Sequence, residues 1–190
     1  MLLRCIGSIN YWVEVYSKEQ VTLLTNHTFQ KQSTLSQFEI VNPNGRQKLS
    51  IPTVKATRKG LYKSVAIDYS TNWQVEHWRS IENAYLKSPF YLYYGYKIEA
   101  VFKTNQTSLL DFNLALFKTI KDCIKLKSVV QIDNETSLYF EEMSADKTIV
   151  YPQVFDTKLP FEENLSILDL LFNLGPETLD YLKQSRYTNP

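Results

Sequence analysis

Cysteine, histidine and glycine are all scarce in this 190-residue chain, and their scarcity excludes several kinds of site. Two cysteines, Cys5 and Cys123, are too few for a disulfide framework, and we expect both to be buried and inert. With only two histidines there is no cluster of zinc-ligand type, so we expect no metal. Among the five glycines there is neither a G-x-G-x-x-G motif nor a P-loop. We therefore expect no bound cofactor.

Long apolar runs and an excess of charge are lacking as well. No run of 18 apolar residues occurs, and residues 1–6 are too short for the apolar part of a signal peptide. The expectation is a cytoplasmic protein without membrane insertion. A net charge of +1 gives no reason to expect a nucleic-acid target. With 44% hydrophobic and 22% charged residues, the composition predicts one ordinary folded domain over residues 1–190.

Aromatic residues are abundant, at 14% of the chain, and thirteen of them are tyrosines. Tyrosine offers both a ring and a hydroxyl, which suits sugar sites, although a tyrosine-rich core explains the same composition. The aromatics are densest in residues 69–96. Their spacing predicts a helix that begins after Ser70 or Thr71 and ends by Ser88, which precedes a proline. We expect this segment at the centre of the fold.

The rest of the chain predicts an α/β fold, a mixed sheet with flanking helices. Residues 2–6, 21–24 and 129–132 have strand patterns, and residues 9–16 a short helix. Asn44-Gly45 predicts a hairpin. Capping boxes at Ser108 and Ser166 predict the starts of two further helices. The periodicity of the first predicts that it buries Leu110, Leu114, Phe117, Ile120 and Ile124. Residues 133–146 are acidic and predict an exposed loop.

Ligands of such folds bind beyond the carboxyl ends of strands. Gly7 and Ser8 follow the first predicted strand, and Asn26 and His27 follow the second. We therefore place these four residues at the edge of a site. The basic loop at residues 55–60 is a second place where an anion could bind, or it is simply a solvated loop.

Seven stretches of the chain together resemble the WbqC-like protein family of bacteria. They are FQKQ at 29–32, NG at 44–45, LSIP at 49–52, HWRSI at 77–81 with Trp73 before it, YLKSPF at 85–90, YPQVF at 151–155 and LSILDLLFNLG at 165–175. The resemblance implies a role in making O-antigen or a related surface polysaccharide, and a transfer of glycine or another small acyl group onto a sugar. The chain departs from the family at Gly7-Ser8, where proline is usual, and at Ser36-Gln37, where Asn-Arg is usual.

Acyl transfer needs a base and hydrogen-bond donors, and histidine is the usual base near neutral pH. The catalytic candidates are therefore His77, on the aromatic helix, and His27, after the second strand. Each histidine has an alternative without catalysis. His77 would be a core histidine, and His27 would be part of a solvated strand edge. No G-x-S-x-G elbow and no activated cysteine is apparent, so a covalent intermediate is not expected.

A single pocket is predicted where the second strand meets the aromatic helix. The substrate-binding candidates beside the two histidines are Gln30, Lys31, Gln32, Trp73, Tyr151 and Gln153. The partners expected are a sugar or nucleotide-sugar substrate and an activated acyl donor. Two functions remain open: a transferase that uses a histidine base, and a noncatalytic module that binds a nucleotide sugar or another protein of the pathway. The sequence does not determine the oligomeric state.

Overall fold

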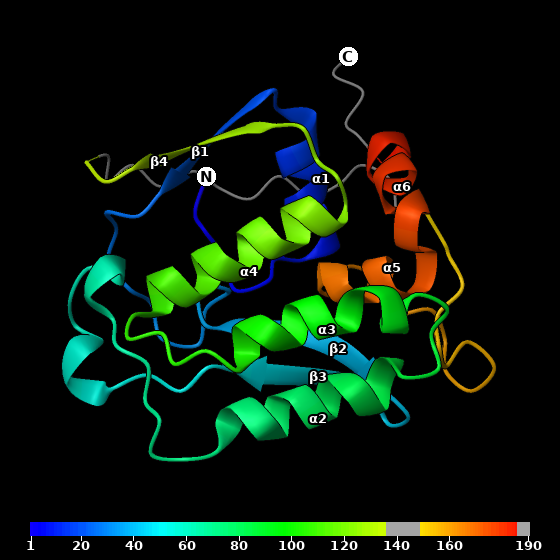
Figure 1. Cartoon of the computed structure of the whole chain (residues 1–190), viewed down its shortest axis with the longest axis horizontal. Helices are drawn as coiled ribbons and strands as arrows, with labels where there is room; N and C mark the ends of the chain where they lie inside the picture. The colour runs from blue at the N-terminus through cyan, green and yellow to red at the C-terminus, as the bar shows by residue number, and fades with distance from the viewer. Residues whose placement is uncertain (136–148, 186–190) are drawn as a thin grey trace.

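The computed structural model describes residues 1–135 and 149–185 of the chain (Figure 1). The predicted acidic loop at 133–146 lies outside these ranges, apart from its first three residues. The helices are α1 (Ile9–Ser17), α2 (Trp73–Tyr85), α3 (Tyr91–Phe102), α4 (Leu109–Cys123), α5 (Ile167–Leu174) and α6 (Thr178–Gln184). Short 3-10 turns occupy Lys55–Thr57, Tyr62–Ser64 and Gly175–Glu177.

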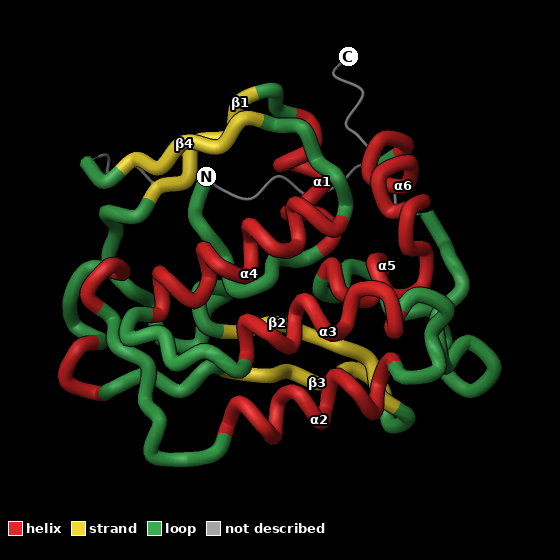
Figure 2. Tube along the Cα trace, in the orientation of Figure 1, coloured by secondary structure: helices red, strands yellow, loops and turns green. Residues whose placement is uncertain are grey.

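The strands form two separate pairs. β1 (Gln20–Leu24) runs parallel to β4 (Val129–Asp133), and β2 (Gln37–Asn42) runs antiparallel to β3 (Gly45–Ser50). In Figure 2 the parallel pair lies at one end of the molecule and the β2–β3 hairpin behind α3 and α2. The α/β class predicted from the sequence is confirmed, with its parallel and antiparallel strands in different sheets.

The hairpin was predicted from its turn, and the turn chemistry is as expected. Gly45 has a φ of 106°, a conformation that residues with a Cβ rarely adopt. The Asn42 Oδ1 atom accepts a hydrogen bond of 2.8 Å from the Asn44 backbone N–H. This turn fixes the strand register, which places Glu39 directly opposite Lys48.

The predicted first strand is mostly irregular. Only Leu2 pairs, in a parallel bridge with Leu24. The strand geometry is lost because Ile6 and Gly7 have φ values of 61° and 79°. A positive φ is unusual for a β-branched residue, so this bend is maintained by its surroundings. The Trp12 indole N–H, which donates to the Ile6 carbonyl at 2.7 Å, is one such contact.

The two predicted capping boxes had different outcomes. The Ser108 hydroxyl accepts from the Asp111 backbone N–H at 3.0 Å, as expected. The side chain of Ser166 makes no such bond, and Asp169 points into the protein instead. The buried face of α4 is also rotated from the predicted one: Leu110 and Leu114 are half-buried, and the fully buried residues are Leu109, Phe112, Asn113, Leu116, Phe117, Ile120 and Cys123.

The aromatic helix α2 begins and ends close to its predicted limits. It packs on β2 and α3 and lies along one edge of the molecule in Figure 1, rather than at the centre. The reason is that the opposite face of the helix is largely polar: Trp73, Ile81 and Tyr85 are buried, whereas Glu76 and Arg79 face solvent. Within the described ranges, no helix has the length and apolar character needed to cross a membrane.

Candidate functional site

The candidate site is a cavity of about 650 Å³ between the N-terminal segment and the hairpin. Four parts of the chain line it: residues 2–8, residues 27–35, the β2–β3 hairpin, and the two residues Asn164 and Ser166 before α5. Most of the lining side chains are polar or charged, and the volume is in the range of small-molecule sites.

Residues 2–8 form the first wall of the cavity, and Gly7 determines the path of their backbone. A Cβ added there would lie 2.4 Å from Tyr11 Cδ1 and 2.9 Å from Trp12 Nε1, so no side chain fits without rearrangement. The Gly7 carbonyl accepts a hydrogen bond from the Ile167 N–H, and Ser8 forms an antiparallel bridge with Ser166. The first residues of α1 and α5 are thereby held side by side at the cavity.

His27 lies on the second wall, after the end of β1, as predicted. Its backbone is anchored because its carbonyl accepts from the Tyr62 N–H at 2.8 Å, and its ring lies 5.0 Å from the Tyr62 ring. Both of its ring nitrogens are buried, and neither has a hydrogen-bond partner among the residues that the structure describes. Burial lowers the pKa of His27 below the ordinary value of 6.5, so the imidazole is neutral near neutral pH. Neutral imidazole is the form that accepts a proton.

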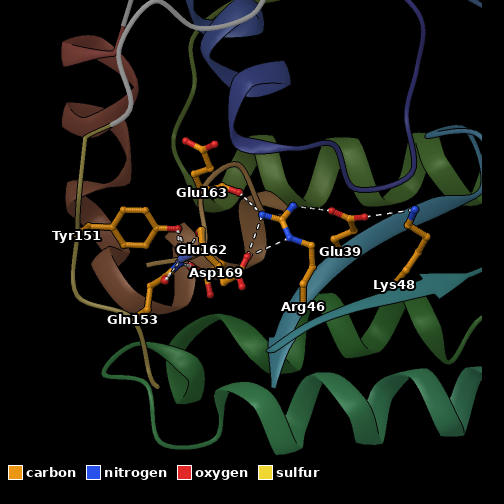
Figure 3. Close-up of polar contacts among 8 residues, drawn as sticks. All are labelled: Glu39, Arg46, Lys48, Tyr151, Gln153, Glu162, Glu163 and Asp169. Carbon is orange, nitrogen blue, oxygen red and sulfur yellow. Dashed lines mark hydrogen bonds and ion pairs between the residues drawn. The ribbon is translucent and has the colours of Figure 1, made fainter. Parts of the chain in front are cut away.

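The hairpin wall carries a group of charged side chains centred on Arg46 (Figure 3). Arg46 Nη1 binds Glu39 Oε2 at 2.7 Å, and its Nε and Nη2 atoms both lie 3.1 Å from Glu162 Oε2. Nη2 also donates to the Glu163 carbonyl at 2.7 Å. Lys48 Nζ is 3.4 Å from the other oxygen of Glu39. These contacts join the hairpin to the segment that precedes α5.

Tyr151 and Gln153 are not among the residues that line the cavity. In Figure 3 they lie beside Glu162, on the side away from Lys48. The Tyr151 hydroxyl donates to Asp169 Oδ2 at 2.5 Å, and Gln153 Nε2 donates to the same oxygen at 2.9 Å. The Gln153 amide also makes two hydrogen bonds with the backbone of Glu162, at 2.9 and 3.0 Å. The buried Asp169 is thus connected through Gln153 and Glu162 to Arg46. We infer that Tyr151 and Gln153 hold the wall in place rather than contact a ligand.

Asp169 is expected to make the stability of the protein depend on pH. Burial raises the pKa of its carboxyl above the ordinary value of 3.8, although Tyr151 and Gln153 act in the opposite direction. A raised pKa means that stabilisation is fully present below 3.8, the unfolded value, and is lost as the pH rises through the folded value. The free energy of unfolding of the native chain should therefore fall relative to that of Asp169→Asn as the pH rises from about 4. Urea unfolding at a series of pH values measures it, and a pH-independent difference would contradict the assignment.

The predicted residues do not share one pocket. His27, Gln30 and Gln32 line the cavity, whereas Lys31 is exposed and is not part of its lining. His77 and Trp73 also lie outside the lining, on α2. The His77 ring contacts Trp73 at 5.4 Å and Phe38 at 6.3 Å, and burial lowers its pKa to about 4. Phe38, whose ring the His77 ring contacts, does line the cavity. This cavity therefore does not join the two histidines in the way that the single predicted pocket would.

The remaining residues singled out in the sequence differ in whether they line the cavity. Gly7 and Ser8 line the cavity, but no residue of the basic loop at 55–60 does, and Arg58 instead binds the side chain and carbonyl of Thr53. Both cysteines are buried free thiols, and burial raises the pKa of each. They are therefore poor nucleophiles, although Cys5 lines the cavity. Among the described residues, no three His, Cys, Asp or Glu side chains form a group that could hold a metal ion.

Sequence reasoning missed the charged group around Arg46, and it identified Ser166 only as a helix cap. A signal for the wall was present, because the Asn44-Gly45 turn fixes a register that sets Glu39 opposite Lys48. No local signal pointed to Glu162, which is far from the hairpin in sequence.

Comparison with known proteins gives one match. A family model described as the WbqC-like protein family matches residues 6–145 and 132–181. No curated protein and no solved structure matches the chain.

Proposed function

Since the chain belongs to the WbqC-like protein family, we propose that it acts in the biosynthesis of a bacterial surface polysaccharide such as O-antigen. Its cavity binds a sugar or nucleotide sugar, and the protein transfers glycine or another small acyl group from an activated donor onto that sugar. The observation that carries this proposal is that His27 lines a polar cavity of small-molecule size and that its ring nitrogens have no hydrogen-bond partner within residues 1–135 and 149–185. The roles of the lining residues follow from the chemistry of acyl transfer.

In the proposed reaction, His27 removes the proton from a sugar hydroxyl or amine as that group attacks the acyl carbon. A new bond forms between the sugar and the acyl carbon, the bond from the acyl carbon to the leaving group breaks, and the proton passes from His27 to the leaving group. Gln30 and Gln32 also line the cavity, and an amide N–H group is suited to bind a sugar oxygen or the developing oxyanion.

A noncatalytic role, as a module that binds a partner protein, has one observation in its favour. Helix α3 exposes Leu92, Tyr93 and Tyr96, at 77%, 67% and 62% of their full areas. Exposed aromatic residues that lie together are typical of interaction surfaces. In this alternative the protein acts by binding another protein of the pathway.

Mass analysis of the surface glycan from a strain that lacks the gene separates the two roles. A transferase predicts a repeat unit lighter by one small acyl group, restored when the gene is returned. A binding module predicts a repeat unit of unchanged mass in a reduced amount. An unchanged mass and amount would contradict both roles.

A further inference from the structure

Helix α3 presents an apolar face to solvent that its packing does not use. Its opposite face, which includes Gly95 and Ile98, is buried where the helix packs on α2, α4 and α5. The exposed face carries Leu92, Tyr93 and Tyr96, whose spacing along the helix puts their side chains together. None of the residues of α3 lines the cavity, so this face is separate from the candidate site. An exposed apolar patch of this kind marks a place where another surface binds.

Two lysines border the same face of the helix. Lys97 lies one turn after Tyr93, and its Nζ atom is 5.9 Å from the centroid of the Tyr96 ring. Lys103 lies two turns after Tyr96, at the C-cap of the helix. Its side chain is 70% exposed, and its Nζ atom contacts Glu99 at 2.8 Å. The face therefore combines aromatic rings with positive charges at its border.

The positive charge of the chain is concentrated around α3. Residues 86–127, which hold α3 and α4, carry seven lysines and three acidic residues, a net charge of +4. The rest of the chain has fourteen basic and seventeen acidic residues, a net charge of −3. The two helices pack on each other (Figure 1), so the positive charge is gathered in one part of the molecule. The small total of +1 therefore conceals an asymmetry, and an anionic surface attracts the positive part.

We propose that the exposed face of α3 docks on an anionic lipid surface. Leu92 and the rings of the two tyrosines enter the boundary between headgroups and acyl chains, where tyrosine is favoured because its hydroxyl stays in water. Lys97 and Lys103 lie beside them and bind lipid phosphates. The helix lies along the surface of the bilayer and does not cross it. The proposal goes beyond the proposed function and does not depend on it, since it uses no residue of the cavity.

The lysines favour a lipid surface over a protein partner. Protein interfaces are enriched in tyrosine but depleted of lysine, whereas helices that bind anionic membranes combine an apolar and aromatic face with lysines. Glu99 is the acidic residue of α3, and it is half-buried and bound to Lys103, which limits its repulsion of lipid phosphates. The exposed residues of the face thus suit an apolar layer that is covered by negative charge.

Sedimentation of the purified chain with lipid vesicles tests the docking surface. The native chain should bind vesicles of phosphatidylcholine and phosphatidylglycerol in equal parts. It should bind vesicles of phosphatidylcholine alone about tenfold more weakly or less, and high salt should weaken binding to the mixed vesicles. Leu92→Ser should weaken binding about tenfold, because it removes the most exposed apolar side chain of the face. Lys97→Gln combined with Lys103→Gln should weaken it about twentyfold, the product of about fivefold for each lysine.

Matched controls make the same chemical changes elsewhere in the molecule. Lys18→Gln combined with Lys55→Gln lowers the net charge by the same amount, and it breaks the i,i+4 pair of Lys18 with Glu14 in place of the Lys103 pair. Val129→Ser removes an exposed apolar side chain from β4. Both controls should bind the mixed vesicles like the native chain.

Failure of the native chain to sediment with the mixed vesicles, or equal binding to the neutral ones, would overturn the proposal. Native-like binding by both Leu92→Ser and the Lys97 and Lys103 double variant would overturn it as well. Light scattering of the chain without lipid covers the other occupants. A dimer that Leu92→Ser dissociates, with no binding to vesicles, makes the face an interface between two copies. A monomer that does not bind vesicles leaves the face to a partner protein, and in either case lipid docking is wrong.

Discussion

Replacement of His27 by alanine is expected to lower the rate of acyl transfer by about 10²–10⁴-fold, the usual contribution of a general base. His27 lines the cavity and its ring nitrogens have no partner among the described residues, so its removal takes away a base without breaking a side-chain hydrogen bond in that part of the chain. The fold should survive, because the His27 carbonyl, which binds the Tyr62 N–H, remains in the variant. The rate is measured by mass spectrometry of the acylated product.

His77→Ala is the matched control, because His77 is the other histidine of the chain and lies outside the cavity lining. It should retain most of the activity and lose some stability through its contacts with Trp73 and Phe38. The pH profile adds a second readout. Since burial lowers the pKa of His27, its base form persists below the ordinary value of 6.5, and activity should fall only at a lower pH. A large loss in His77→Ala with none in His27→Ala would contradict the assignment.

Replacement of Trp73 by alanine is expected to lower the free energy of unfolding by about 3–5 kcal/mol, the cost of emptying a buried aromatic site. Trp73 is 2% exposed, and its ring contacts Phe112 at 5.6 Å and Phe102 at 6.2 Å. These contacts join α2 to α3 and α4, so the cavity left by alanine lies between three helices and cannot easily collapse. Urea unfolding monitored by circular dichroism measures the loss.

Trp78→Ala, on the same helix, is the control that shows how much of the stability loss comes from burial. It also removes an indole, but from a less buried position. Trp78 is only half-buried, against Tyr91 and Phe102. The cost should be about 1–2 kcal/mol, since less apolar area returns to water. Equal losses in the two variants would show that the packing of α2 is not as described.

The helices and the hairpin were largely predictable because a few neighbouring residues specify each of them. The Asn44-Gly45 turn has no need of distant contacts to define the hairpin. His27 was selected by the rule that ligands bind beyond the carboxyl ends of strands. That rule needs only the end of a strand, which the sequence pattern indicates. The bend at Ile6 was not predictable, because its positive φ is maintained by tertiary contacts such as that of Trp12.

The arrangement of the site was less predictable because it depends on contacts between distant segments. The pattern Ser166 to Asp169 has the form of a capping box, but the Asp169 carboxyl binds Tyr151 and Gln153 and is buried. Tyr151 and Gln153 were expected to bind substrate, but their side chains converge on Asp169, and neither residue lines the cavity. The sequence placed His77 on an apolar helix face, where a core histidine was the alternative to a catalytic one. The contacts of its ring with Trp73 and Phe38 fit the core histidine.

The central claim is that ligand binds in the cavity between the N-terminal segment and the hairpin. Backbone amide chemical-shift mapping of the full chain with a nucleotide sugar tests it most directly. The account predicts shifts concentrated at residues 4–8, 27–35, 39–48 and 164–166, with little change in α2. Shifts confined to α2 around His77, or to the exposed face of α3, with none around the cavity, would contradict it.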